Sequence, residues 1–229
     1  MAPRPKAAPS TFVLLVRHGT TPTTGRELPG PGAGPGLSDE GRAQAEAAAE
    51  RIASWDPSLP ALSSIYSSPL RRTRETAEVL AKAVGLPAQE CQELVDCDAG
   101  EWAGASFKEL ARRPEWATVQ LYPSGFCFPG GDSLLGMQAR AVGAVRSLAS
   151  RHPGQSIVVV SHADPIKAVV ADALGLYFDL FQRIVVSPGS ISTVGYGHTG
   201  PIVIALNWTG LAAQRPPTAK ARPERRRGH

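Results

Sequence analysis

A short apolar run that ends in an arginine and a histidine constrains this chain more than any other feature. Residues 11–16 read Thr-Phe-Val-Leu-Leu-Val, and Arg17, His18 and Gly19 follow directly. The run predicts a buried strand, and open α/β sheets bind ligands at the carboxyl ends of their strands. An arginine beside a histidine suits a phosphate clamp with a nucleophile inside it, and the glycine would let a ligand approach the backbone.

Two later strands bring further phosphate-binding groups to the same kind of position. Residues 62–66 form an apolar run, and Ser67-Ser-Pro-Leu-Arg-Arg-Thr73 follows it and opens a predicted helix. Residues 156–161 form a β-branched run that ends at His162. The sequence therefore predicts two histidines and several guanidinium groups at one edge of a sheet.

Two more segments complete the pattern. The acidic stretch 93–102 offers a proton donor, and residues 128–133, Phe-Pro-Gly-Gly-Asp-Ser, indicate a turn before a capped helix. With these segments in this order, the chain resembles the histidine phosphatase superfamily, also called the phosphoglycerate mutase-like family. The resemblance covers roughly residues 11–208.

The resemblance implies roles for individual residues. His18 would be the catalytic nucleophile, and Arg17, Arg72 and His162 would bind the phosphate, with His162 also counted among the catalytic groups. Arg72 is the arginine of the Ser-Pro-Leu-x-Arg pattern. Arg71 falls on the variable position of that pattern and is expected to be a solvated helix residue.

The same roles follow from the chemistry of a phosphate monoester. Its dianion must be neutralised before a nucleophile can approach phosphorus, and guanidinium and imidazole groups donate charge-assisted hydrogen bonds to its oxygens. Imidazole is nucleophilic when neutral, and nearby cations favour the neutral form. A carboxyl group would protonate the departing alkoxide and then activate water as a base. This scheme requires no metal and no cofactor, and its partner is a small phosphorylated substrate.

The sequence leaves the identity of the proton donor open. The family places a Glu four residues before the Gly of a Gly-x-Trp-x-Gly element, and that position holds Asp96 here, with a reach one methylene shorter. Asp164, two residues after His162, is a second candidate, although Asp before Pro also predicts an N-cap. Asp98, Glu101 or a water relay are further alternatives.

Two irregular segments are expected near the site. The Pro/Gly-rich residues 22–36 should overhang His18, and loops in such places commonly carry specificity. Thr24 stands where many family members have Asn, so that it either contacts phosphate or is an ordinary loop residue. Residues 102–128 should hold one short helix, around 107–113, and aromatic side chains that either line the pocket or pack a lid.

The order of elements predicts a three-layer α/β/α fold with a mostly parallel central sheet, of the phosphoglycerate mutase-like type. Two late strands, 190–196 and 202–208, should form an edge hairpin through a turn at His198, whereas His152 is expected to be exposed. Helices are expected over residues 38–54, 70–84, 133–151 and 165–174.

Composition divides the chain into a flexible N-terminus (1–10), one histidine phosphatase domain (11–210) and a basic Pro/Arg-rich tail (211–229). The two ends hold eight of the 24 basic residues but one of the 20 acidic residues, which leaves 16 basic and 19 acidic residues in the domain. The tail lacks apolar periodicity and is predicted to be disordered. We do not expect a nucleic-acid partner in spite of its charge.

Other features bear on location and assembly. No apolar run approaches the ~20 residues that span a bilayer, and the N-terminus lacks an apolar signal segment. Three cysteines without metal-ligand spacing predict reduced thiols. We expect a cytoplasmic protein with no membrane partner and no metal; a dimer is one of the oligomeric states that the sequence allows.

Three functions are compatible with the sequence. The leading prediction is a metal-independent phosphatase that acts on a small phosphomonoester through a phosphohistidine. The second is a phosphoglycerate-type phosphomutase, but such mutases carry a longer basic insertion, whereas this middle segment has chiefly Lys108, Arg112 and Arg113. The third, a noncatalytic phospholigand-binding or protein-binding relative, conflicts with the intact pair of histidines. The sequence does not identify the substrate.

Overall fold

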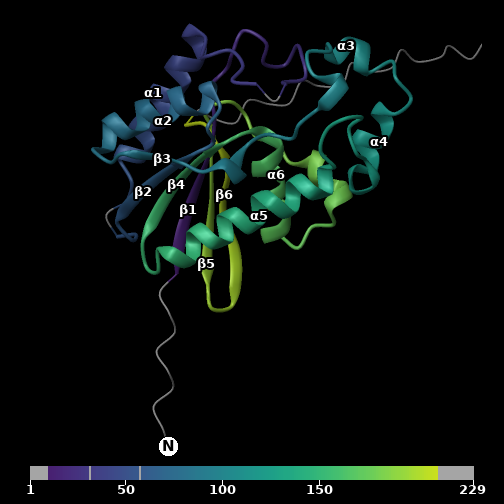
Figure 1. Ribbon diagram of the computed structural model, residues 1–229. Coiled ribbons are helices and arrows are strands. Elements are labelled where there is room, and N and C mark those ends of the chain that lie inside the picture. Colours follow the sequence, from purple (N-terminus) through teal and green to yellow (C-terminus); the bar gives the residue numbers. More distant parts are fainter. Residues whose placement is uncertain (1–9, 31, 57, 211–229) are drawn as a thin grey trace, which may run out of the picture.

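The computed structural model describes residues 10–30, 32–56 and 58–210. The predicted flexible N-terminus, apart from Ser10, and the predicted disordered tail lie outside these residues. A six-stranded sheet in the order β3-β2-β4-β1-β5-β6 forms the centre of the described part (Figure 1). Its strands are β1 (Thr11–Arg17), β2 (Leu62–Ser67), β3 (Ala88–Glu90), β4 (Ser156–Ser161), β5 (Ile191–Gly197) and β6 (Gly200–Trp208).

The sheet is mixed and mostly parallel, as the element order predicts. β1 pairs in parallel with β4, β4 with β2, and β2 with β3, whereas β5 and β6 add an antiparallel hairpin beside β1. His198 lies in the hairpin turn and is exposed, which confirms its prediction. Because β1 and β4 are parallel and in register, Arg17 lies opposite Ser161, and the residues that follow both strands meet at one edge.

Helices cover both faces of the sheet (Figure 1). Alternate residues of a strand point to opposite faces, so Leu14 and Val16 join one core cluster, whereas Val13 and Leu15 join the other. The first cluster lies under α1 and α2, and the second lies under α5 and α6. The helices are α1 (Asp39–Ala53), α2 (Arg71–Val84), α3 (Phe107–Leu110), α4 (Trp116–Leu121), α5 (Leu134–Arg151) and α6 (Ala163–Ala173).

Local signals set several helix ends. The hydroxyl groups of Ser38 and Ser133 accept hydrogen bonds from the third residue beyond them and so cap α1 and α5. α2 ends where Gly85 adopts a left-handed conformation, with φ of 71°. Among the described residues, no helix is long and apolar enough to cross a membrane.

Three expectations need correction. β3 was not predicted because its three residues are exposed and polar enough to show no strand pattern, and only pairing with β2 makes them a strand. The middle segment holds two short α-helices, α3 and α4, and a 3-10 helix at Pro123–Gly125, instead of one helix. His152 is half-buried because its Nε2 pairs with the hydroxyl group of Tyr66 at 2.9 Å, although its position after a helix suggested full exposure.

Candidate active site

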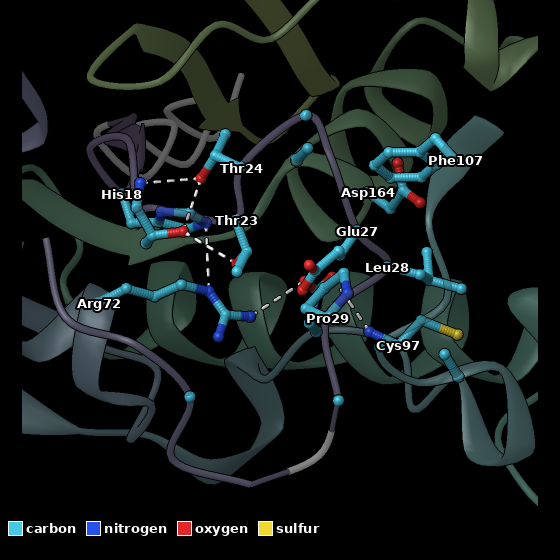
Figure 2. Close-up of a pocket in the computed structure, with 18 of the residues that line it drawn as sticks. His18, Thr23, Thr24, Glu27, Leu28, Pro29, Arg72, Cys97, Phe107 and Asp164 are labelled. Atoms are coloured by element: carbon cyan, nitrogen blue, oxygen red, sulfur yellow. Dashed lines mark hydrogen bonds and ion pairs between the residues drawn. The ribbon is translucent and has the colours of Figure 1, made fainter. Parts of the chain in front are cut away.

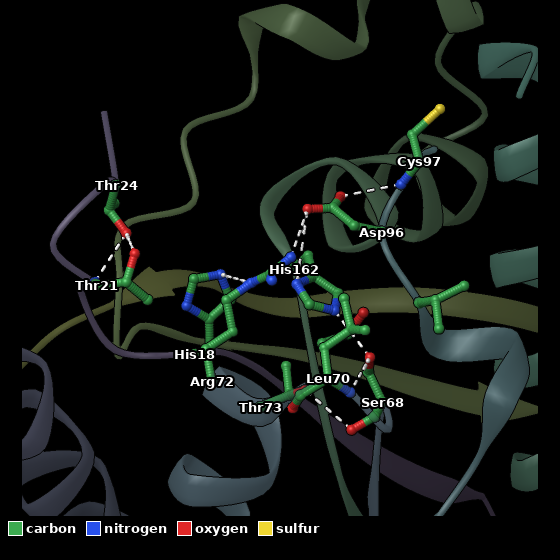
Figure 3. Close-up of polar contacts among 12 residues, drawn as sticks. His18, Thr21, Thr24, Ser68, Leu70, Arg72, Thr73, Asp96, Cys97 and His162 are labelled. Carbon is green, nitrogen blue, oxygen red and sulfur yellow. Dashed lines mark hydrogen bonds and ion pairs between the residues drawn. The ribbon is translucent and has the colours of Figure 1, made fainter. Parts of the chain in front are cut away.

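The carboxyl ends of β1 and β4 bring His18 and His162 together (Figure 3). The ring centroids lie 5.2 Å apart, and the backbone N–H of His18 donates to the carbonyl oxygen of Ser161. The His18 side chain is 5 % exposed and that of His162 is fully buried. The two histidines therefore form one enclosed pair, as the repeated strand pattern predicts.

The contacts of His18 leave Nε2 as its nucleophilic nitrogen. Nδ1 lies 2.7 Å from the carbonyl oxygen of Gly19, which can only accept, so the proton sits on Nδ1 and the lone pair on Nε2. The Nε–H group of Arg72 donates to this lone pair at 3.3 Å. Burial, followed by His162, Arg72 and Arg17, lowers the pKa of His18 well below 6.5. The free site thus holds His18 neutral.

His162 is oriented from the other side. Its Nε2 lies 2.9 Å from the hydroxyl group of Ser68, and its buried Nδ1 has no hydrogen-bond partner among the described residues. Burial, followed by Arg72, Arg17 and Arg140, lowers the pKa of His162 well below 6.5. If Ser68 donates to Nε2, the proton of the neutral ring lies on Nδ1, and this unpaired donor faces the cluster.

The two predicted arginines enter the same cluster. Arg72 is 3 % exposed at the start of α2, and its Nη2 lies 3.2 Å from Oδ2 of Asp96. Arg17 donates from Nη1 to the carbonyl oxygen of Val186 at 2.7 Å, while its buried Nε has no partner among the described residues. Unpaired buried N–H groups beside arginines are suited to an anion that brings several acceptor oxygens. Arg71 is solvated, as predicted, and it pairs with Glu75.

Asp96 is the carboxyl group that joins this cluster. Its Oδ1 accepts from the backbone N–H of Cys97 at 3.1 Å, and its Oδ2 lies 3.7 Å from Nδ1 of His162. The guanidinium of Arg140 holds the carbonyl oxygen of Asp96 at 3.1 Å. Side chain and backbone are therefore both fixed beside the two histidines.

The alternative carboxyl groups lie elsewhere. The predicted N-cap at Asp164 is wrong: α6 begins at Ala163, two residues before the expected start, with His162 at its N-cap. Asp164 instead lines the pocket and accepts from Nζ of Lys167 at 3.1 Å. Asp98 accepts from the backbone N–H of Gly100, and neither Asp98 nor Glu101 lines the pocket.

Two loop predictions have definite outcomes. Gly19 is required by packing, since a Cβ there would overlap the carbonyl group of Gly41 in α1. The close approach of a ligand to this glycine stays a prediction. The Thr24 hydroxyl group accepts from the backbone N–H of Thr21 at 2.9 Å and so folds its own loop. Thr24 also lines the pocket, so a contact with phosphate stays a prediction.

His18, Arg17, Arg72 and Asp96 line a pocket of about 420 Å³ (Figure 2), whereas the fully buried His162 is not among its lining residues. The 22–36 segment forms one wall, as expected, with Thr23, Leu28 and Gly34 among the lining residues. The aromatic residues of the middle segment have different environments. Three of them line the pocket, namely Phe107, Trp116 and Phe128. Phe126 packs in the core, and Tyr122 is exposed. Sequence reasoning missed Lys167 and Gln182, because only the packing of α6 against the 3-10 helix η4 (Phe178–Arg183) brings them here.

The buried neutral histidines predict a pH-dependent stability. In the unfolded chain each histidine titrates near its ordinary pKa, whereas the pKa values of His18 and His162 are lowered in the folded protein. As the pH falls below about 6.5, the unfolded chain binds protons that the folded chain does not, so the free energy of unfolding decreases. The slope from each histidine approaches about 1.4 kcal/mol per pH unit at most.

Urea denaturation between about pH 7.5 and about pH 5.5 measures this slope. We expect a shallower slope in His18→Ala than in the wild type. His198→Ala, which removes an exposed histidine, should keep the wild-type slope. Equal slopes in the wild type and His18→Ala would contradict the burial of a neutral imidazole.

Together, the strand ends of the α/β sheet and the histidines and arginines gathered there form a site suited to a phosphoryl group. A comparison with protein families identifies the class of protein. The chain belongs to the histidine phosphatase superfamily (branch 1), which it matches over residues 13–209.

Individual relatives agree with this assignment. The chain is 31% identical over 180 residues to phosphoserine phosphatase 1 of Hydrogenobacter thermophilus, covering 76% of this chain and 82% of the relative. It is 31% identical over 202 residues to a bifunctional protein of Mycobacterium tuberculosis, covering 87% of this chain, and it spans about half of that relative (54%). A solved mycobacterial glucosyl-3-phosphoglycerate phosphatase superposes with a TM-score of 0.74 at 25% identity, covering 87% of this chain and 99% of the other. The family and these names support hydrolysis of phosphoric monoesters.

Proposed function

We propose that this protein is a metal-independent phosphatase that hydrolyses a small phosphomonoester through a phosphohistidine on His18. The observation that carries the proposal is the state of His18: a neutral imidazole with its proton fixed on Nδ1 and its Nε2 lone pair among cationic groups. A neutral nitrogen is a competent nucleophile, and the surrounding donors suit the oxygens of a phosphoryl group.

Phosphate binding requires an exchange of partners at Arg72. In the free site its Nε and Nη2 atoms contact His18 and Asp96. Phosphate oxygens would take over these donors, together with the unpaired Nε of Arg17 and Nδ1 of His162. This exchange frees the lone pair of His18 for attack. It also leaves Asp96 beside the bound phosphate.

The reaction then has two steps. Nε2 of His18 forms a bond to phosphorus as the bond from phosphorus to the ester oxygen breaks, and Asp96 gives its proton to the departing alkoxide. Asp96 next accepts a proton from water, whose oxygen attacks phosphorus and releases His18 and inorganic phosphate. We assign this role to Asp96 over Asp164 because Asp96 lies against Arg72 and His162, whereas Asp164 lies across the pocket from His18 in Figure 2.

Phosphate release from a panel of phosphomonoesters in excess EDTA tests the proposal, with phosphoglycerate mutase activity assayed on the same preparation. We expect turnover that chelation does not reduce, because the nucleophile and all the proposed phosphate donors are side chains. Loss of activity in EDTA that added metal restores would contradict metal independence. Isomerisation without hydrolysis would indicate the mutase. The absence of activity in both assays would indicate a binding protein.

We further propose that the substrate is small enough for the 420 Å³ pocket and that the protein works in the cytoplasm. All three cysteines, Cys91, Cys97 and Cys127, are free thiols, which suits a reducing compartment. Oligomeric state and the absence of nucleic-acid and membrane partners stay predictions.

A further inference from the structure

A second charged group lines the pocket away from the phosphate cluster. Lys167, in the second turn of α6, keeps only 16% of its side chain exposed, and its Nζ lies 5.8 Å from the ring centroid of buried Phe181. Nζ donates to Oδ1 of Asp164 at 3.1 Å and to Oε1 of Gln182 at 3.0 Å. Lys167, Asp164 and Gln182 all line the pocket.

These contacts leave hydrogen-bond donors unused. An ammonium group has three donors, and two of them are taken, so Lys167 keeps one. Because Lys167 can only donate, the amide oxygen of Gln182 must face it, which leaves the amide N–H₂ group. No hydrogen bond from that group is found among the described residues. A lysine and an amide on neighbouring elements thus present donors that a carboxylate, with two acceptor oxygens, can satisfy.

The position of this group favours the alcohol part of the substrate over its phosphate. Of the cations that line the described pocket, Arg17 and Arg72 belong to the phosphate cluster, and Lys167 is the remaining one. Asp164, its partner, lies on the other side of the pocket from His18 and Arg72 (Figure 2). A substrate whose phosphate reaches His18 would therefore extend its other end toward Lys167.

Building on the proposed phosphatase function, we propose that Lys167 and Gln182 form a carboxylate subsite and that the substrate is a phosphomonoester of a small hydroxy acid or amino acid. The second oxygen of Asp164 is an acceptor for the hydroxyl or ammonium group beside that carboxylate. Lys167 is then a specificity-determining residue. The competing role is a purely structural one, in which Lys167 only holds α6 against the 3-10 helix Phe178–Arg183.

Matched substrates separate the two roles. O-Phosphoserine and O-phosphoethanolamine differ by one carboxylate, and 3-phosphoglycerate and glycerol phosphate differ by carboxylate against hydroxymethyl. The readout is the ratio of kcat/KM within each pair, measured for wild type, Lys167→Met and Lys167→Arg. The matched control is Lys108→Met, which removes an exposed lysine of α3 outside the pocket.

We expect the wild type to prefer the carboxylate member of at least one pair by about tenfold or more, as charge-assisted hydrogen bonds imply. Lys167→Met should reduce that preference on the order of 10- to 100-fold. Lys167→Arg should retain most of it, and Lys108→Met should leave it unchanged. Wild-type ratios near one in both pairs, or equal losses on both members of a pair in Lys167→Met, would overturn the subsite.

Measuring the binding of these substrates to His18→Ala tests the carboxylate subsite independently of catalysis. Calorimetric Kd values for each pair, in His18→Ala and in His18→Ala/Lys167→Met, report the carboxylate preference without turnover. A preference that depends on Lys167, together with no hydrolysis of any ester by the wild type, would support the subsite and overturn the proposed phosphatase. Hydrolysis without a carboxylate preference in either kcat/KM or Kd would support the proposed phosphatase and overturn the subsite.

Discussion

His18→Ala should abolish hydrolysis of every phosphomonoester, with kcat lowered roughly 10⁴-fold or more, as for the loss of other enzymatic nucleophiles. The imidazole Nε2 is the atom to which the phosphoryl group would be bonded, and no other side chain in the cluster presents a free lone pair on a neutral nitrogen at that position. Water would have to attack the ester directly.

The same variant should remain folded. The His18 side chain makes one backbone contact, to the carbonyl oxygen of Gly19, and the strand beneath it is held by β4 and β5 on its two sides. Circular dichroism and a cooperative thermal transition check the fold. His198→Ala is the matched control, because it removes a histidine from the exposed hairpin turn.

A trapping experiment makes the test specific for the covalent step. Wild-type protein quenched during turnover of a ³²P-labelled ester should retain label in an acid-labile, base-stable form, and His18→Ala should retain none. Substantial turnover by a folded His18→Ala protein would disprove the phosphohistidine mechanism.

Asp96→Asn should slow the hydrolysis of alkyl phosphate esters by roughly 10²- to 10⁴-fold, the usual contribution of general acid catalysis. An amide can neither protonate the alkoxide nor activate water. The loss on p-nitrophenyl phosphate should be at least about tenfold smaller, because nitrophenolate leaves with little protonation. The amide oxygen can still accept from the backbone N–H of Cys97, so the loop should keep its position.

Asp164→Asn is the matched control for Asp96→Asn, since it removes the other carboxyl group that the sequence offered as donor. We expect it to show no dependence on the leaving group, because Asp164 pairs with Lys167 away from His18. Equal losses on both kinds of ester in Asp96→Asn would point to another donor. A leaving-group dependence in Asp164→Asn alone would transfer the role to Asp164.

The sequence predicted the parts of the site that follow strands. His18 and His162 come directly after apolar runs, and Arg72 lies in a recognisable turn between a strand and a helix. Local patterns of this kind fix both an element and its end, and parallel pairing then places the ends together. The mostly parallel sheet and the antiparallel hairpin were predictable for the same reason.

The far wall of the pocket could not be predicted in this way. Lys167 looks like any polar residue in a helix, and Gln182 lies in a short 3-10 helix that no sequence pattern predicts. The hydrogen bond between Lys167 and Gln182 depends on how α6 packs against the 3-10 helix Phe178–Arg183, which is a tertiary contact between elements. β3 and the half-buried His152 were missed for a similar reason, because strand pairing and a tyrosine distant in sequence decide their environments.

The contact between Gly19 and Gly41 separates ancestry from activity in this sequence pattern. A side chain at either glycine would overlap the backbone of the other segment. The close packing of the residues after β1 against α1 therefore requires glycine at both positions. A variant that had lost His18 and the proposed catalysis would still need both glycines to fold. The glycine of Arg-His-Gly thus reports on the fold, whereas the arginine and the histidine carry the proposed activity.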